Sequence, residues 1–410
     1  MTVTAPAQTA RPFDRRFVIV VASALSYFIG LGILAPVLPR YIEDVLDGGG
    51  AEVGIAVGAF AVTAALLRPG VGRVGDRRGR RILIVGGAFI AGVATLGYGL
   101  PGGLAMLVLF RLLAGVGEAA TFIGAATTAQ DLAPPDRRGQ AASLFSISIY
   151  GGLSFGPVIG EWTYTQHGAG WTWIVAAAAA FVASGIALLL PADIGMPDPA
   201  DAPAEPVPEP TGMRRWIHPA GLGPGVILAL GAAGYAGFAS FVPLYVDEIG
   251  LDGAGMAFFE YGVIVLSVRI FASRLPDILG TRRGPLLALT LQGTGLLLMG
   301  LWASPTGLYT ATAIYAAGVS LLYPALFPAV VDAAPEGERS QAIATFTLFF
   351  DLSQGIGAPF LGVVVTLTEN RGAFIAASAL SFIALAIHQR TTRPVVGPVD
   401  EPCPPAEPGG

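Results

Sequence analysis

The sequence predicts an all-helical integral membrane protein made of two repeated halves with six helices each. Composition is the first of three observations behind this prediction. The chain has 410 residues, of which 53% are hydrophobic and 12% charged, and its mean hydropathy is +0.66. Soluble domains carry roughly 25% charged residues, so most of this surface is not suited to water.

Twelve apolar stretches form the second observation, because roughly 20 apolar residues are enough for a helix to cross a bilayer. The first stretch is too long for the core of a signal peptide and more follow it, so we interpret it as a retained span. The stretches cover about residues 17–39, 52–71, 82–100, 103–130, 139–165, 170–190, 221–246, 254–273, 285–303, 306–331, 341–367 and 372–389.

The third observation is an internal repeat at an offset of 201 residues. The run that starts at Asp131 and includes Pro134 returns as the run that starts at Asp332 and includes Pro335. The same shift relates Arg68 to Arg269, Asp76 to Asp277, Gly79 to Gly280, Arg81 to Arg282 and Gly156 to Gly357. Parallel repeats of this size place a substrate path between the two halves, so the chain is predicted to move a substrate.

The repeat divides the chain into two bundles joined by a linker. Residues 191–213 hold seven prolines and five acidic side chains, and such a segment cannot bury enough apolar surface to fold. We therefore expect a cytoplasmic tail at 1–16, a six-helix bundle at 17–190, a Pro-rich acidic cytoplasmic linker at 191–220, a second six-helix bundle at 221–390 and a disordered cytoplasmic tail at 391–410.

Lysine does not occur in the sequence, and all 23 basic residues are arginine. A phosphate-binding Gly-rich loop needs a lysine to reach the nucleotide, so transport driven by ATP is not expected of this polypeptide. Cysteine is almost as rare, because only Cys403 occurs. One cysteine excludes disulfides within the chain and thiolate metal sites.

Arginine also predicts the orientation of the chain in the membrane. With the amino terminus in the cytoplasm, the cytoplasmic segments hold 18 arginines and the outer loops hold Arg40 and Arg371. This distribution follows the positive-inside rule, to which acidic residues contribute little. We expect a multi-pass protein of the cell membrane, plasma or inner, with both termini in the cytoplasm.

A basic loop between the second and third stretches carries the most specific motif, Gly72-Arg73-Val74-Gly75-Asp76-Arg77-Arg78-Gly79-Arg80-Arg81. Gly79 permits a tight reversal of the chain, and Asp76 can accept hydrogen bonds from a helix amino terminus or an arginine. The basic side chains can also contact the anionic inner leaflet. A loop that only sets topology is the simpler interpretation.

The full pattern resembles the G-x-x-x-D-R-x-G-R-R signature of the major facilitator superfamily, and the second copy around Asp277 is degenerate. The resemblance covers nearly the whole chain and extends to the drug and sugar efflux permeases of that superfamily. It implies two six-helix bundles around a cavity in the middle of the membrane and alternating access to that cavity. It also implies a conformational latch formed by Gly72, Asp76, Arg77, Gly79, Arg80 and Asp277.

The fourth stretch contains two charges. The run that begins at Arg111 and continues to Gly117 resembles the R-x-x-x-G-x-G element of the same superfamily, and Glu118 follows it. Arg111 and Glu118 are two helical turns apart, so they project from one face with a separation of about 10 Å. Each buried charge costs about 2.5–3.5 kcal/mol to insert, which favours mutual pairing or a water-filled cavity. A network that only locks the helix to a neighbour is the alternative.

Glu118 is the better candidate for a proton carrier, because a carboxylate removed from water can titrate near neutral pH. Arg111 is expected to tune it. Two further intramembrane acids, Glu260 and Asp351, could also bind a cation or carry a proton, and Asp351 could instead cap a helix break. Arg68 and Arg269 lie near the cytoplasmic face, where we expect snorkelling and gating contacts instead of ligand binding.

In the fifth stretch, Gly152, Gly156, Pro157 and Gly160 form a pattern that resembles the G-x-x-x-G-P-x-x-G antiporter motif of the superfamily. Small residues let helices pack closely, and a proline bends the helix. The match is partial, because Glu161 stands where the family pattern has another Gly. The motif favours export, with plain helix packing as the alternative.

Aromatic side chains near the predicted cavity suit an amphipathic or lipophilic ligand, whereas packing is the commoner role for any single ring. The candidates are Tyr27, Tyr150, Tyr235, Phe346 and Phe350. The three histidines, His167, His218 and His388, lack the spacing of metal ligands, so no metal site is expected.

These features predict a secondary active transporter and not an enzyme. We expect proton-coupled efflux of a small organic or amphipathic compound by a monomer in the lipid bilayer, without a cofactor, ATP or nucleic acid. Two alternatives stay open. One is a proton-coupled importer of a sugar or of an organic anion that pairs with Arg111, and the other is a non-transporting membrane sensor, against which the short loops argue.

Overall fold

The computed structural model describes residues 14–100, 102–134, 137–194, 217–272, 274–335 and 338–391. Most of the predicted linker and almost all of both predicted tails fall outside these ranges. The first half holds α1 (Arg15–Asp44), α2 (Gly50–Arg78), α3 (Arg80–Gly97), α4 (Gly103–Asp131) and α5 (Arg138–Ala187). The second half holds α6 (Pro219–Glu248), α7 (Gly255–Phe271), α8 (Leu275–Leu301), α9 (Pro305–Asp332), α10 (Arg339–Leu367) and α11 (Asn370–Thr391).

These helices account for all twelve predicted stretches. Among the described residues, 10 helices are long and apolar enough to cross a membrane. The fifth and sixth stretches share α5, which Gly168 interrupts with a φ of 78°, and α7 has 17 residues and matches the eighth. Gly280 likewise interrupts α8, with a φ of 65°, so α8 begins before the predicted ninth stretch.

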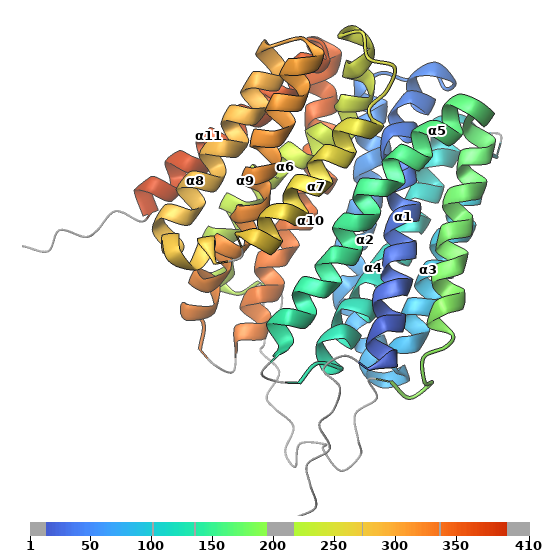
Figure 1. Cartoon of the computed structure of the whole chain (residues 1–410), viewed down its shortest axis with the longest axis vertical. Helices are drawn as coiled ribbons and strands as arrows, with labels where there is room; N and C mark the ends of the chain where they lie inside the picture. Colours follow the sequence, from blue (N-terminus) through green and yellow to red (C-terminus); the bar gives the residue numbers. More distant parts are fainter. Residues whose placement is uncertain are drawn as a thin grey trace, which may run out of the picture.

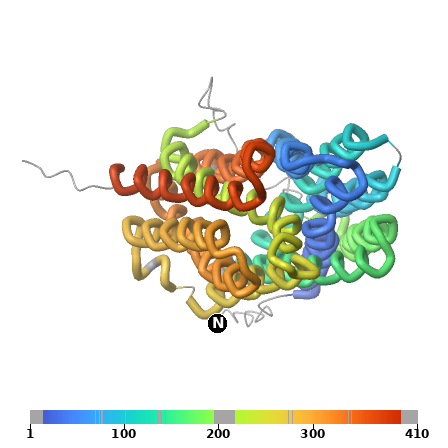
Figure 2. Tube along the Cα trace, turned by 90° about the horizontal axis from the view of Figure 1, so that it is seen from above, coloured from blue at the N-terminus to red at the C-terminus, as the bar shows by residue number. Residues whose placement is uncertain are grey.

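The two halves form two bundles that stand side by side, α1 to α5 in one and α6 to α11 in the other (Figure 1). The view from above shows the same division (Figure 2). We call the end of the molecule at which α1 begins and α11 ends the terminal end. The opposite end, at which α1 ends and α2 begins, is the distal end.

The sequence repeat is preserved in the packing. A Cβ atom placed on Gly117 of α4 would meet the carbonyl oxygen of Gly87 in α3 at 2.7 Å or less, and the same atom on Gly318 of α9 would meet the carbonyl oxygen of Ala288 in α8 at 2.7 Å. Both residues of the second pair lie 201 positions after the first. The α3–α4 and α8–α9 pairs therefore cross at equivalent positions.

Three apolar cores show where the two bundles join. One core joins both halves, and it includes the distal parts of α1 and α6, such as Val37 and Phe241. A second core, which includes Phe17 and Val20, contains residues of the first half. A third, which includes Ile227 and Leu228, contains residues of the second half. The described bundles thus share a core at the distal end and keep separate cores at the terminal end.

Candidate functional site

Three charged side chains meet between the two bundles near the middle of the helices. Arg68 of α2 lies 3.0 Å from Asp351 of α10 and 3.8 Å from Glu118 of α4, in both cases from its Nη2 atom to a carboxylate oxygen. Arg68 and Glu118 belong to the first half and Asp351 to the second. We call Arg68, Glu118 and Asp351 the central triad.

The two carboxylates of the central triad are buried, and the triad is incompletely hydrogen-bonded. Glu118 is 8% exposed and Asp351 6% exposed. The Nε of Arg68, the Oε2 of Glu118 and the Oδ2 of Asp351 find no hydrogen-bond partner among the described residues. The guanidinium of Arg68 also lies 5.0 Å from the centre of the Phe122 ring. Unpartnered polar atoms at a buried charged cluster are costly, so the cluster is suited to take up a further group.

A second set of three charges lies at the distal end. Arg40 of α1 donates hydrogen bonds to Glu161 of α5 at 2.8 Å, to Asp247 of α6 at 2.9 Å and to the carbonyl oxygen of Pro243 at 3.0 Å. Glu161 also accepts a hydrogen bond from the backbone N–H of Gly255, at the start of α7. These contacts tie the two halves together. We call Arg40, Glu161 and Asp247 the distal triad.

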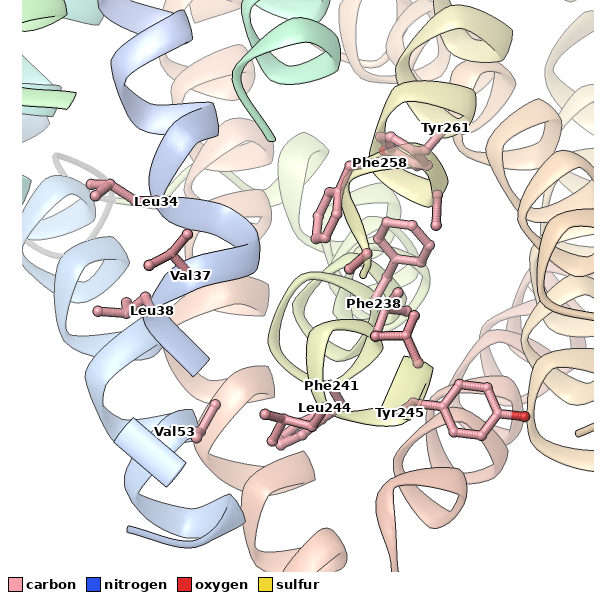
Figure 3. Close-up of a cluster of buried hydrophobic side chains, with 14 of the residues drawn as sticks. Leu34, Val37, Leu38, Val53, Phe238, Phe241, Leu244, Tyr245, Phe258 and Tyr261 are labelled. Carbon is pink, nitrogen blue, oxygen red and sulfur yellow. The ribbon is translucent and has the colours of Figure 1, made fainter. Parts of the chain in front are cut away.

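Apolar side chains pack between the bundles at the distal end (Figure 3). This core draws side chains from α1, α2, α6 and α7, and Figure 3 labels Leu34, Val37, Leu38, Val53, Phe238, Phe241, Leu244, Tyr245, Phe258 and Tyr261. α2 and α10 also pack closely at this end because Gly54 of α2 has no side chain. A Cβ on Gly54 would overlap the carbonyl oxygen of Ala358 in α10. This packing and the distal triad close the distal end.

The repeat counterpart of the Arg68–Asp351 pair is a contact between Arg269 of α7 and Tyr150 of α5. Arg269 lies 201 residues after Arg68, and Asp351 lies 201 residues after Tyr150. Arg269 donates a hydrogen bond to the Tyr150 hydroxyl at 3.1 Å, and its guanidinium lies 4.7 Å from the centre of that ring. Both contacts cross between the halves, but only the first has an ionised acceptor.

Arg111 does not contact Glu118, which differs from the expected tuning of one by the other. Arg111 donates to the carbonyl oxygens of Ala56 at 2.9 Å and Val57 at 3.4 Å and lies 4.5 Å from the centre of the Phe60 ring. The two side chains leave α4 from levels about 10 Å apart, and α2 supplies a nearer partner to each. Arg111 therefore holds α4 against α2.

None of the remaining candidates belongs to the central triad. Glu260, on α7, is partly buried, and its Oε2 has no partner within the described residues. Tyr27 is 3% exposed and lines a small cavity inside the first bundle together with Arg111. Phe346 is fully buried in the core of the second bundle, where it packs 5.1 Å from Tyr323, so it does not line an open cavity as we expected.

Two aromatic candidates stay accessible. Tyr235 is partly buried and lies 5.4 Å from Tyr261 between ring centres, and Phe350, next to Asp351, is 40% exposed. Tyr323 interacts electrostatically with Arg68, Arg269 and Asp351. Phe122 from the first half and Tyr323 from the second thus both interact with charges of the central triad.

The glycines of the antiporter-like motif contact α1. A Cβ on Gly152 would overlap the backbone of Phe28, one on Gly156 would lie 2.6 Å from the carbonyl oxygen of Ile29, and one on Gly160 would overlap the carbonyl oxygen of Ile33. Pro157 lies in the same helix, within 3.3 Å of such a Cβ on Gly32 of α1. The motif therefore makes the close crossing of α1 and α5.

The motif expected to act as a latch is described only in part. The side chains of Asp76, Arg77 and Asp277 lie outside the described set. Gly79 has a φ of 82° and separates α2 from α3, and a Cβ on Gly72 would meet no neighbour within 4 Å. Arg80 forms an ion pair with Asp131 of α4. The described contacts of this turn stay within the first half.

Sequence reasoning missed the two arginines that organise these triads. Arg68 was assigned to snorkelling and gating, and Arg40 was counted only as an outer-loop charge. The signal that could have found them is the position of each arginine in or beside an apolar stretch, since an arginine inside a membrane helix needs an opposite charge. The sequence holds candidate acids for both, but it does not show which helix faces meet.

Known proteins with similar sequences are membrane transporters. The uncharacterized MFS-type transporter STM4428 of Salmonella typhimurium is 29% identical over 370 residues, which cover 88% of this chain and 92% of the relative. The uncharacterized MFS-type transporter YhhS of Escherichia coli is 27% identical over 398 residues, with 95% of each chain covered. Their names state no substrate, so the resemblance to drug and sugar efflux permeases stays a prediction.

Solved structures show the same fold. A bacterial homologue of the human lysosomal transporter Spinster, inward-facing and unoccupied, has a TM-score of 0.73 at 17% identity and covers 91% of this chain and 95% of its own. A POT family transporter in complex with a thioalcohol-conjugated peptide has a TM-score of 0.77 at 13% identity and covers 92% and 95%. At these identities the likeness concerns the fold alone.

The family comparison covers nearly the whole chain. The model of the Major Facilitator Superfamily matches residues 20–289 and 253–405, which include every described helix from α2 to α11 and most of α1. The chain therefore belongs to the Major Facilitator Superfamily of secondary membrane transporters.

Proposed function

We propose that the protein exports a small organic compound in exchange for protons, and that the central triad couples proton binding to the movement of the two halves. The observation that carries this proposal is a pair of buried carboxylates, one from each half, that share a single guanidinium. Glu118 and Asp351 were candidates from sequence, and Arg68 is the group that joins them.

Charge supports a proton at this site. With both acids ionised, the central triad has a formal charge of −1, and an unpaired charge withdrawn from water costs several kcal/mol. One proton makes the triad neutral. The titratable and charged groups around it are Tyr27, which interacts electrostatically with Glu118, and Tyr323, which interacts with Arg68 and Asp351.

The position of Arg68 between the two halves supports a coupling of proton binding to their movement. Arg68 reaches across the interface between the halves, and its partner Asp351 holds it only while that carboxylate is ionised. A proton on Asp351 removes this attraction, so proton binding and loosening of the link are one event. The distal triad remains, because Asp247 is 64% exposed to solvent and Glu161 accepts from Arg40 and from the backbone N–H of Gly255.

Access follows from the predicted orientation. If the termini lie in the cytoplasm, the terminal end faces the cytoplasm and the closed distal end faces outward. The described state is then closed on the outer side by the distal packing and the distal triad, so an exporter in this state would load its substrate from the cytoplasm. Export itself is supported by the antiporter-like motif at Gly152, Gly156, Pro157 and Gly160, and the latch at Asp76 belongs to the same proposal.

The importer of organic anions has less support. That alternative needs Arg111 to pair with a substrate carboxylate, and the guanidinium of Arg111 already donates to Ala56 and Val57 and stacks on Phe60.

A flux experiment tests the proposal. Purified protein is placed in lipid vesicles that contain a pH-sensitive dye, and a panel of small organic compounds is added in turn. We expect at least one compound to cause a proton movement that Asp351→Asn and Glu118→Gln abolish. Glu260→Gln, which changes an acid outside the central triad, serves as the matched control and should retain the signal. Transport that ignores a collapsed proton gradient would contradict the coupling.

A further inference from the structure

We infer that the transported compound is a protonated primary or secondary amine that binds at the central triad in place of the proton. This inference rests on the proposed function, since it names the substrate class of the same site. It depends on four features: the charge of the triad, its unpartnered oxygens, the rings beside it and the acidic distal surface.

The charge of the triad is balanced equally well by a proton or by a monovalent cation. Arg68 supplies one positive charge against the two carboxylates of Glu118 and Asp351. Either addition brings the buried charges to neutrality, and both together leave an excess positive charge out of water. The proton and the cation therefore exclude one another, which is the requirement for exchange.

The unpartnered atoms show which cation fits. The Oε2 of Glu118 and the Oδ2 of Asp351 are buried acceptors without a donor among the described residues. An ammonium group with N–H bonds can donate to both, and hydrogen bonds to charged groups are worth about 1.5–3 kcal/mol. A quaternary ammonium has the same charge but no N–H donor, so it leaves both oxygens unsatisfied.

Aromatic rings beside the triad also favour a cation. Phe122 already holds the guanidinium of Arg68 at 5.0 Å from its ring centre, and Tyr323 faces the same charges from α9. The face of an aromatic ring attracts cations through its quadrupole.

The distal surface carries negative charge where the two halves meet. Glu43 at the end of α1 lies close to Asp44 and to Asp247 and Glu248 at the end of α6. Surfaces of one sign attract counter-ions. Cations are thus favoured at the distal end as well as at the central triad.

Three probes that share a phenylbutyl chain and differ in the head group test the substrate class on the full-length protein in detergent. They are 4-phenylbutylammonium, its trimethylammonium analogue and the neutral 4-phenylbutanol, with binding measured by calorimetry. We expect the primary amine to bind at least about tenfold more tightly than either analogue. Equal affinity for the quaternary or the neutral probe, or no binding of the amine, would overturn the inference.

The competition with protons gives a second, independent measure. Because the amine and the proton exclude one another, binding of the amine should release about one proton per site at a pH where the triad is protonated. Its dissociation constant should then rise about tenfold for each unit that the pH is lowered. The charge of the probe does not change below neutral pH, so binding without proton release contradicts the exchange.

Variants locate the binding site. Glu118→Gln and Asp351→Asn should each abolish amine binding, and Glu260→Gln should not. Thermal unfolding of each variant shows that it is folded, and Glu118→Asp, which keeps the charge, should retain weakened binding. Amine binding that survives both neutral variants places the site elsewhere.

The outcomes separate this inference from the proposed function. If a proton gradient drives the flux of a neutral or anionic compound and the amine does not bind, the substrate class is wrong and the proton coupling stands. If the amine binds at Glu118 and Asp351 and crosses the vesicle membrane without any proton movement, the substrate class stands and the proton coupling is wrong.

Discussion

The central and distal triads contain the same three kinds of group and differ in their surroundings. Each has one arginine of the first half between a glutamate of the first half and an aspartate of the second. In the distal triad, Arg40 makes three hydrogen bonds and Asp247 is 64% exposed. In the central triad, both carboxylates are buried and three polar atoms find no partner among the described residues.

This difference shows that the types of charged residue in a cluster do not decide its role. The same three types can form a structural tie or a group that changes its charge. A charge network whose groups are hydrogen-bonded and partly exposed to solvent suits a structural tie. A dry, underbonded network changes its charge or binds a ligand instead. The distal triad is therefore the structural tie, and the central triad is the group proposed to switch.

Replacing each arginine by glutamine gives the largest expected difference. Arg68→Gln leaves two buried carboxylates without a cation, so we expect a loss of about 3–5 kcal/mol in the free energy of unfolding and loss of transport. Arg40→Gln should cost less, because water can solvate Asp247. Denaturant unfolding in detergent measures both. Arg68→Gln combined with Asp351→Asn should recover part of the stability, and equal costs for the two single variants would erase the distinction between the triads.

The response to pH should separate the two aspartates. The link between Arg68 and Asp351 exists while Asp351 is ionised, so it is present at high pH and lost as the pH falls. Two distances between the halves are expected at the terminal end, a short one with the link and a longer one without it. Lowering the pH should change the ratio of their populations by about tenfold. Spin labels at Gln130→Cys and Val331→Cys in a Cys403→Ser background report this distance.

The matched variants are Asp351→Asn and Asp247→Asn. The first should abolish the pH response and the second should leave it intact. A response that disappears with Asp247→Asn alone would assign the switch to the distal triad.

Weakening the distal triad should open the distal end. Glu161→Gln removes the charge that accepts from Arg40 and from the backbone N–H of Gly255, contacts worth about 1.5–3 kcal/mol. A cysteine at Val53, which is fully buried in the distal core, should then react with a water-soluble thiol reagent about tenfold faster. Glu369→Gln, at an exposed residue of the same end, should leave the rate unchanged. An unchanged rate in Glu161→Gln would show that apolar packing alone closes this end.

The smallest effect is expected at the repeat counterpart of the central pair. Tyr150→Phe removes the hydroxyl that accepts from Arg269 but keeps the ring, so we expect about 1 kcal/mol or less in stability and the same pH response. Tyr150→Asp gives Arg269 an ionised partner like that of Arg68 and should add a second pH-sensitive step to the spin-label titration. A single step in that variant would mean that the local surroundings, and not the residue pair, decide the response.

The fold was readable from the sequence because membrane helices leave a strong local signal. Twelve apolar stretches and an offset of 201 residues predicted the helices and the two halves, and the family match confirms the class of fold. Helix ends were less predictable. α1 extends to Asp44 and α2 to Arg78, since polar residues beyond the apolar stretch continue the helical hydrogen bonds.

The site was readable only in part. Glu118 and Asp351 stood out as acids within apolar helices, and the structure brings them to one arginine. Arg111 and Glu260 stood out equally and lie elsewhere, because a charge in a helix shows that a partner is needed but not which helix supplies it. Phe346 was expected at a cavity and is fully buried in the second bundle, since helices that are apolar all round do not reveal their inner face.

The sequence by itself determined that this chain crosses the membrane many times, in two repeated halves, with acids held inside its helices. These are properties of composition and spacing, which bilayer thickness and helix geometry convert directly into structure. Only the tertiary structure decided that Arg68 and Arg40 each hold one acid from either half, and that both acids are buried in the central triad whereas Asp247 of the distal triad is exposed. Pairing and solvation depend on contacts between helices far apart in the chain, and no local pattern records them.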